Sequence, residues 1–357
     1  MLTRIKLTLK QHRFETIAVV VLCLIAAAAA LGEAYRLNSI QLPAGCVVGQ
    51  RYMFAPDTSV PSTACQLATD RFYAVSNGTD MGLVRYMLLG LLPFVVGILF
   101  GAPLVAKEIE QGTAPLSWAL VGSRRRWLFG KMLAATLLIV PLLLVAGLAA
   151  DVLQGASSPG LDPHASFENF ASRGVMVVFW GLATLFGTVA LGTLLGRTLP
   201  AVILALVVCF LARGFWEIGL NRTVLPPLAV MQSENPQDPQ NGQNGQTMMY
   251  GQYAWTPSDL NVYYRTYLDG KPWDGDMNAW WNEHQPPMTV DPSSGLPVGV
   301  AVDTGTSPQI QGPYSVPFVI HGDRYWPIVA LESGILLLGS LFCGAVALIW
   351  VDRRRPY

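Results

Sequence analysis

The chain has 357 residues, of which 52% are hydrophobic and only 13% are charged, and its mean hydropathy is +0.40. Soluble domains carry about 25% charged residues, so this composition excludes one large soluble core. The formal net charge is zero, so the chain has no global basic field of the kind that attracts nucleic acid. We therefore expect a protein of the lipid bilayer with no nucleic-acid partner.

Six apolar runs are long enough to cross the roughly 30 Å of hydrocarbon in a bilayer. The first is Ala-rich and follows four basic residues, a pattern that also resembles a signal peptide. Its length favours an anchor that is retained in the protein. The expected spans are Thr16–Tyr35, Gly82–Ala106, Trp127–Ala150, Gly174–Leu195, Pro200–Ile218 and Pro327–Val351.

Basic residues beside the spans predict the orientation. Together with Lys131, the segments 1–15, 107–126, 196–199 and 352–357 hold thirteen of the 23 Lys and Arg residues. Cytoplasmic flanks of membrane spans are enriched in these residues. We therefore expect an all-α protein of a bacterial cell membrane, with six transmembrane helices and with its N- and C-termini in the cytoplasm.

Two polar segments would then lie outside the cell. Segment 37–80 contains Cys46 and Cys65, which either form a disulfide there or remain free thiols. Segment 220–325 is a long insertion between the fifth and sixth spans. Its Pro-, Gln-, Asn- and Gly-rich first part is typical of a linker, and its aromatic second part predicts a small cap or pieces resting on the membrane interface. The resulting division of the chain is 1–219, 220–325 and 326–357.

The most informative segment connects the second and third spans. It reads Phe100-Gly-Ala-Pro-Leu-Val-Ala-Lys-Glu-Ile-Glu-Gln-Gly-Thr113 and continues to Ser123-Arg-Arg-Arg-Trp127. A helix leaves the bilayer, becomes acidic, breaks at a glycine and re-enters behind an arginine cluster. Such a hairpin presents charge to a soluble partner. The alternative is an ordinary solvated loop whose arginines only follow the positive-inside rule.

This segment resembles the signature region of the ABC type-2 permease family, with Lys107 in place of the usual Arg. The resemblance implies a half-transporter of six spans that pairs with a second permease subunit and with cytoplasmic ATPase subunits. The hairpin 107–126 would include a coupling helix seated in a groove of the ATPase, with Glu108 and Glu110 as its polar contacts. The residues assigned to coupling in this way are Lys107, Glu108, Glu110, Gly112, Thr113 and Trp118.

No catalytic chemistry is expected of the chain itself. Gly130-Lys131 lacks the upstream glycine of a phosphate-binding loop and is followed by Met132, so Lys131 is interpreted as an interfacial anchor. There is no HExxH or CxxC motif and the histidines are scattered, so we expect neither a catalytic residue nor a metal site. No cofactor is expected to bind directly, because ATP and Mg would belong to the partner ATPase.

Ionisable residues inside spans are functional hypotheses, because burying charge in lipid is costly. Arg213 and Glu217 lie four residues apart near the outer end of the fifth span, and Glu332 lies inside the sixth. One interpretation is a polar lining or gate of a translocation path. The alternative is an interfacial ion pair or a snorkelling side chain that fixes the helix tilt.

The leading functional prediction is the permease subunit of an ATP-driven exporter. Its substrate would be an amphipathic compound such as a drug, a peptide, a lipid or a secondary metabolite. The alternative is a membrane sensor that relays extracellular ligand binding without net transport. A membrane-embedded enzyme is the least supported class, because no catalytic constellation appears.

Overall fold

The computed structural model describes residues 10–43, 46, 63–159, 161–219, 223–231, 259–268, 271–284, 289–290, 297–298 and 313–353. The chain divides into two compact units. The first comprises Met1–Trp216 and Gly322–Tyr357, and the second comprises Glu217–His321. Each unit is described by itself.

The first unit contains six helices that are long and apolar enough to cross a membrane, which confirms the predicted number of spans. Most of them extend beyond the apolar runs, because polar residues at the membrane boundary continue the helices. The second span combines α4 (Thr79–Gly82), the π-helical segment η2 (Leu83–Leu89) and α5 (Gly90–Glu110). The others are α2 (Arg13–Asn38), α7 (Arg124–Ser157), α8 (Met176–Leu195), α9 (Thr198–Gly219) and α11 (Tyr325–Arg353).

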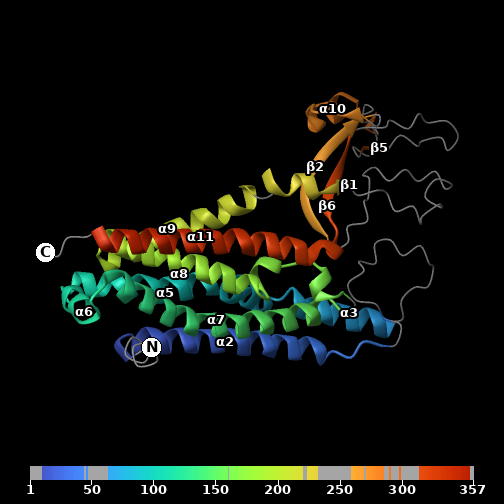
Figure 1. The fold of residues 1–357 in the computed structure, drawn as a ribbon. Coiled ribbons are helices and arrows are strands. Elements are labelled where there is room, and N and C mark those ends of the chain that lie inside the picture. The colour runs from blue at the N-terminus through green and yellow to red at the C-terminus, as the bar shows by residue number, and fades with distance from the viewer. Residues whose placement is uncertain are drawn as a thin grey trace. The chain divides into compact units, whose positions relative to one another are not determined.

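Helices α2, α5, α7, α8 and α11 of this unit run side by side, and three features meet at one end of it (Figure 1). These are the start of α2, the hairpin that carries the short helix α6 (Ala114–Val121), and the end of α11. A hydrogen-bonded ion pair of 2.8 Å between Arg125 and Asp352 joins the start of α7 to the end of α11. We call this the hairpin end. Both ends of the described chain lie there, as an even number of spans requires.

The other end, here the opposite end, holds the connections that precede α4 and α8. A disulfide joins Cys46 to Cys65, whose Cα atoms are 5.7 Å apart. Cys65 belongs to α3 (Thr63–Ser76), a helix in the segment that was expected to be only a polar loop. The short 3-10 helices η3 (Pro163–Ala165), η4 (Phe170–Ser172) and η7 (Gly322–Arg324) complete this end.

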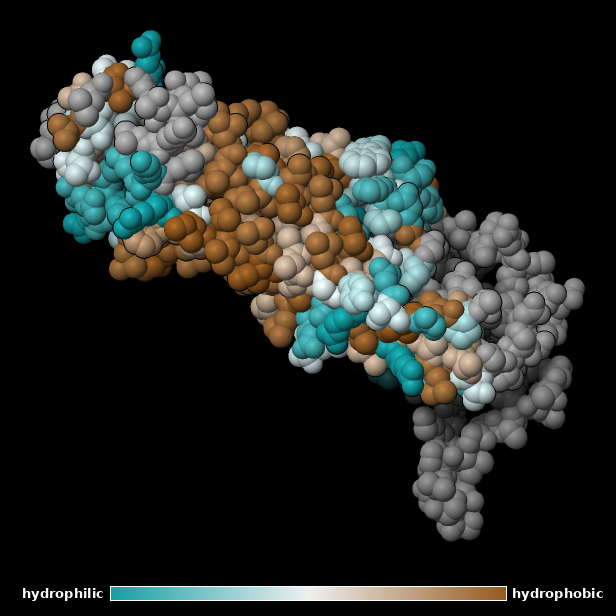
Figure 2. Space-filling model, turned by 90° about the horizontal axis from the view of Figure 1, so that it is seen from below, coloured by the Kyte–Doolittle hydropathy of each residue, from teal (hydrophilic) through white to brown (hydrophobic). Residues whose placement is uncertain are grey.

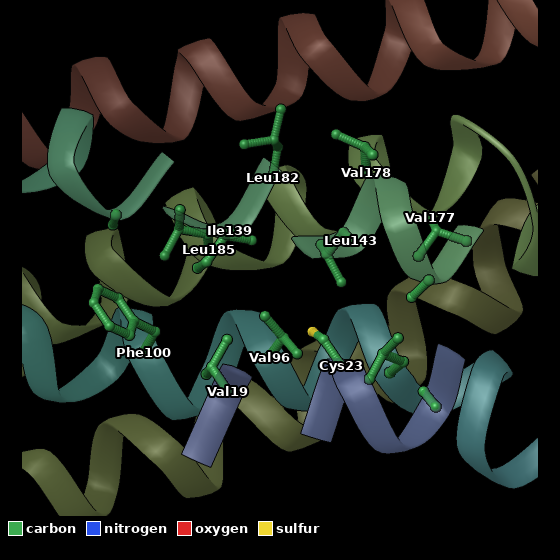
Figure 3. Close-up of a cluster of buried hydrophobic side chains, with 14 of the residues drawn as sticks. Val19, Cys23, Val96, Phe100, Ile139, Leu143, Val177, Val178, Leu182 and Leu185 are labelled. Carbon is green, nitrogen blue, oxygen red and sulfur yellow. The ribbon is translucent and has the colours of Figure 1, made fainter. Parts of the chain in front are cut away.

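The core lies where α2, α5, α7 and α8 converge. Figure 3 shows side chains from these four helices pointing toward one another, among them Val19, Phe100 and Leu143. Helices α5 and α8 approach closely, because a side chain at Gly97 would lie 2.7 Å from the Cβ atom of Thr184. Small residues allow such contacts between membrane helices. The Thr188 hydroxyl also donates to the Gly97 carbonyl, at 3.0 Å.

The outer surface of the helices is hydrophobic, as a membrane-spanning protein requires. Figure 2 shows hydrophobic side chains covering the middle of the face in view, with more polar residues beyond them. Helix α9 is the least covered span, since only 11% of its apolar window is buried. Its Phe210 is 82% exposed and Phe215 is 69% exposed.

The second unit contains a four-stranded antiparallel sheet in the order β1-β6-β2-β3. Its central pair joins β2 to β6, where Tyr263 opposes Phe318 and their rings stack at 4.6 Å. Val316 and Val319 of β6 are fully buried. The strands are β1 (Val230–Met231), β2 (Leu260–Leu268), β3 (Lys271–Pro272) and β6 (Tyr314–Ile320), beside a separate pair of β4 (Thr289–Val290) and β5 (Pro297–Val298), and the unit also contains α10 (Met277–His284).

The prediction of an all-α chain is therefore wrong for this unit, although the chain as a whole is mostly helical. The aromatic content of the segment predicted a cap or interfacial pieces, whereas residues 260–268 form a strand. The strand partners are also distant in sequence, so no hairpin turn reveals the pairing. Most of the predicted linker, residues 232–246, lies outside the described residues.

Candidate functional site

The hairpin of residues 107–126 is built from two helix ends that terminate at glycines. Helix α5 ends in a motif in which the Thr113 amide donates to the Glu108 carbonyl at 3.0 Å and the Gly112 amide donates to Ile109. Gly112 has φ +68°, and Gly122, which follows α6, has φ +74°. Only glycine adopts this left-handed conformation at little cost. The two glycines therefore allow the chain to turn from α5 through α6 into α7.

Glu108 lies inside the hairpin and not on its surface. It is 9% exposed, and its carboxylate forms an ion pair with Lys131 of α7. The Ser117 hydroxyl of α6 donates to the same carboxylate at 3.4 Å, and the Thr113 hydroxyl donates to the Glu108 carbonyl at 3.3 Å. Glu108 thus holds α5, α6 and α7 together.

Lys131 is the buried partner of this pair and is 4% exposed. Its ammonium group also donates to the Leu104 carbonyl at 3.0 Å and lies 4.9 Å from the centre of the Trp127 ring. The interpretation of Lys131 as an interfacial anchor is therefore wrong, because this face of α7 packs against α5 and not against lipid. The lysine is instead part of the site.

Two tryptophans close the hairpin next to this pair. The ring of Trp118 meets the ring of Trp127 edge to face at 6.0 Å, and the Arg124 guanidinium lies 4.6 Å from the Trp118 ring. Trp118 is 9% exposed, and its ring nitrogen has no hydrogen-bond acceptor among the described residues. Trp118 therefore packs α6 against α7.

Lys107 connects the hairpin to the first span. Its ammonium group lies 3.3 Å from the Glu15 carboxylate of α2, and the same carboxylate lies 3.9 Å from Nδ1 of His12. His12 is 3% exposed, and its Nε2 atom has no partner among the described residues. Burial, followed by the charge of Lys131, lowers the pKa of His12 below its ordinary value.

Glu110 connects the hairpin to the fifth span. Its carboxylate accepts a hydrogen bond of 2.8 Å from the backbone amide of Thr198, the first residue of α9. A carboxylate is favourable at this place, because the first amides of a helix lack partners within the helix. Lys107, Glu108 and Glu110 therefore reach α2, α7 and α9, respectively.

Residues 110–113 and Leu116, and not Glu108, form the exposed surface of the hairpin. Glu110, Gln111, Gly112 and Thr113 are exposed at the end of α5. On α6, Leu116 is 68% exposed. Leu116 is therefore an accessible apolar contact on the surface of the hairpin.

The structure brings two of the three predicted path residues to one pair of tryptophans. Glu332 of α11 is 4% exposed and accepts a hydrogen bond of 3.3 Å from the Trp216 ring nitrogen. The Trp216 ring lies 5.3 Å from the Trp180 ring, and the Arg213 guanidinium lies 5.5 Å from Trp180. The side chain of Glu217 lies outside the described residues.

The opposite end has a buried cation that the sequence analysis did not single out. Arg173 is 1% exposed and donates to the Asp151 carboxylate at 3.0 Å. It also donates to the backbone carbonyls of Glu168 at 3.0 Å, of Pro163 at 2.7 Å and of Ser166. In the sequence this arginine lies at the end of a polar loop, so no local signal marks it as buried.

The part of the chain that the structure describes contains no group of three or more His, Cys, Asp or Glu side chains arranged to hold a metal ion. Lys107, Glu108 and Arg125 of the hairpin form ion pairs with residues of α2, α7 and α11, and Glu110 accepts from the backbone of α9. Their arrangement is that of a mechanical connection between helices.

Comparison with known proteins gives one match. The family described as ABC-2 membrane transporter related matches residues 14–220, which is more than half of the chain. The matched region includes five of the six spans and the whole hairpin. No curated protein and no solved structure matches the chain.

Proposed function

The chain belongs to the ABC-2 membrane transporter related family, and from this premise we propose that it exports an amphipathic compound from a bacterial cell. Membership makes it a multi-pass membrane protein and the permease subunit of an ABC transporter. The family is one of membrane subunits without catalytic activity of their own, and we assign ATP hydrolysis to a separate ATPase subunit. Export, the chemical class of the substrate, the bacterial plasma membrane and a second permease subunit are parts of the proposal, as is the absence of a directly bound cofactor.

One observation carries the coupling part of this proposal: the hairpin is tied to three spans. Lys107 contacts α2, Glu108 contacts α7 and Glu110 contacts α9, each through a side chain and within four consecutive residues. A displacement of the hairpin by an ATPase would therefore be transmitted to α2, α7 and α9 together. A solvated loop without such contacts would move alone.

The geometry changes which residues we propose to touch the ATPase. Glu108 faces inward and is paired with Lys131, so it supports the hairpin from inside. We assign the contact surface to α6, with Leu116 as its apolar centre and the exposed residues 110–113 as its polar edge. A short helix with an exposed leucine suits a groove in a soluble partner.

The proposed translocation path passes the cluster of Glu332, Trp216, Trp180 and Arg213. Two aromatic rings offer apolar area, and the carboxylate and the guanidinium offer charge. Such a combination suits a compound with one apolar and one polar part. ATP and Mg would remain on the partner subunit.

The coupling proposal is tested with a candidate ABC ATPase subunit. Both proteins are purified together and reconstituted in vesicles, and ATP-dependent dye transport is measured. Leu116→Asp is expected to reduce severalfold both the amount of ATPase that copurifies with the chain and the rate of dye transport, because it places a charge in an apolar contact. The matched control is Leu67→Asp, since Leu67 is 59% exposed on α3 at the opposite end. Transport by Leu116→Asp at the wild-type rate would contradict the assignment.

The orientation is tested separately in intact cells with a membrane-impermeant thiol reagent. Gln111→Cys at the hairpin is expected to be protected, and Arg71→Cys on α3 is expected to be labelled. The reverse pattern would refute both the topology and the role of the hairpin. Capture of the ATPase without net flux of any compound would instead favour the sensor function.

A further inference from the structure

A shallow recess at the opposite end of the helical unit is outside the hairpin and the proposed path. It lies between η2, the last turns of α7 and the residues that precede α8. The recess is open to solvent and has room for about one water-sized group. Its lining includes Arg85, Leu89, Gln154, Asn169, Ser172 and Arg173.

Arg85 gives this recess its charge. It lies in the middle of the π-helical segment η2, and segments of this type are frequent at functional sites. Within the described residues no hydrogen bond or ion pair engages its guanidinium. An arginine carries five donors and is always charged, so the Arg85 guanidinium offers its donors to water or to an anion.

The carboxylates beside the recess are already occupied. Asp151 receives a hydrogen bond from Arg173, and the Glu168 carboxylate receives hydrogen bonds from Gln154 at 2.8 Å and from Ser158 at 2.9 Å. Arg173 in turn directs its remaining donors to backbone carbonyls. Arg173 is thus paired directly with Asp151, whereas no described carboxylate contacts the Arg85 guanidinium.

The depth of Arg85 in the membrane indicates which anions lie within its reach. Glu110 ends the same continuous span 25 positions later, which corresponds to about 37 Å along a helix. The hydrocarbon layer is only about 30 Å thick, so Arg85 lies near the boundary where lipid phosphates are found. Tyr86 is 66% exposed and Met87 is 60% exposed, and they offer acyl chains an apolar surface next to the recess.

We propose that this recess binds a phosphate group through Arg85, and that the phosphate belongs to the headgroup of a membrane lipid. One phosphate oxygen enters the inner part of the recess, and the others remain at its mouth. Asn169 uses one amide hydrogen for Gln154, which leaves its second one for the phosphate. The guanidinium fork matches the geometry of phosphate oxygens. This site is independent of the proposed transport function.

The test uses the full chain, purified and delipidated in a neutral detergent. Binding of phosphatidylglycerol, of diacylglycerol and of inorganic phosphate is measured by native mass spectrometry and by the shift in thermal unfolding. We expect the affinity of Arg85→Gln for phosphatidylglycerol to be lower than that of the wild type by a factor of about ten or more. Arg85→Lys should be intermediate, because it keeps the charge and loses the fork.

Arg71→Gln is the matched control, because Arg71 is exposed on α3 at the same end and is not among the lining residues of the recess. Its affinity for phosphatidylglycerol should equal that of the wild type. Equal binding by Arg85→Gln and the wild type would overturn the proposal, as would equally tight binding of diacylglycerol, which has no phosphate. If inorganic phosphate bound in an Arg85-dependent way and phosphatidylglycerol did not, the recess would be a phosphate site, but its ligand would not be a lipid headgroup.

Discussion

The two ends of the helical unit each contain a buried cation paired with a carboxylate, but they use different cations. At the hairpin end, Lys131 pairs with Glu108 and donates to one backbone carbonyl, that of Leu104. At the opposite end, Arg173 pairs with Asp151 and donates to three backbone carbonyls, those of Glu168, Pro163 and Ser166. Both side chains are almost completely buried.

The difference follows from the shapes of the two cations. The planar guanidinium presents several donors in fixed directions, so Arg173 fixes the backbone of the connection before α8. The lysine ammonium is a point charge on a flexible stem. Lys131 contacts one carboxylate and one backbone carbonyl. The opposite end is therefore built as a rigid connection. The hairpin end can change its contacts at lower cost, as a coupling element requires.

The largest expected effect comes from breaking the rigid end. Arg173→Met should destabilise the protein by about 3–5 kcal/mol, because it leaves Asp151 and three carbonyls buried without their donor. Thermal unfolding of the purified protein measures the loss. The exposed Arg71→Met serves as the control and should unfold like the wild type. If Arg173→Met lost no more stability than Arg71→Met, the opposite end would not be the more rigid of the two ends.

The second effect sharpens the contrast at the hairpin end. Lys131→Met should destabilise the protein by about 3 kcal/mol, since Glu108 is then buried without its cation. The double variant Glu108→Met with Lys131→Met should recover most of that stability, because two apolar side chains replace a buried ion pair with little net cost. Thermal unfolding of the three proteins measures this recovery.

A control for the buried pair is available at the same end. Arg125 and Asp352 form an ion pair in which the two side chains are 62% and 44% exposed. Arg125→Met should change stability by less than about 1 kcal/mol, because water and salt screen exposed pairs. The outcome that would contradict the contrast concerns the double variant Glu108→Met with Lys131→Met. If it unfolded at the same temperature as Lys131→Met alone, the hairpin end would be as rigid as the opposite end.

The smallest effect concerns pH at the hairpin end. Burial holds the pKa of His12 below 6.5, while the charges of Glu15, Lys107, Glu108 and Lys131 surround it. The unfolded chain therefore binds more protons than the folded one once the pH falls through about 6.5, and stability is lost on acidification. His12→Gln should reduce the difference in unfolding temperature between about pH 7.5 and about pH 5.5.

The wild type measured in the same buffers is the reference for this comparison. An identical response in wild type and His12→Gln would show that the acid sensitivity resides elsewhere. Because His12 contacts the Glu15 carboxylate that also binds Lys107, a confirmed effect would link proton uptake to the hairpin and not to the opposite end.

The amino-acid sequence alone determined the number of spans and the position of the hairpin. Both depend on local composition, since a run of apolar residues must cross a layer of nearly constant thickness and a glycine ends a helix wherever it adopts positive φ. The sequence also placed Cys46 and Cys65 in one polar segment, where the structure joins them. Gly112, which was assigned to coupling from the sequence, adopts the positive φ that the turn at the end of α5 requires.

Only the tertiary structure decided which way the charged side chains face. Glu108 and Glu110 are two residues apart and read alike in the sequence, yet one is buried against Lys131 and the other caps α9 at the surface. The burial of Arg173 and the pairing of β2 with β6 likewise depend on segments far apart in the chain. The physical reason is that the direction of a side chain depends on how helices and strands pack, and local composition does not encode packing.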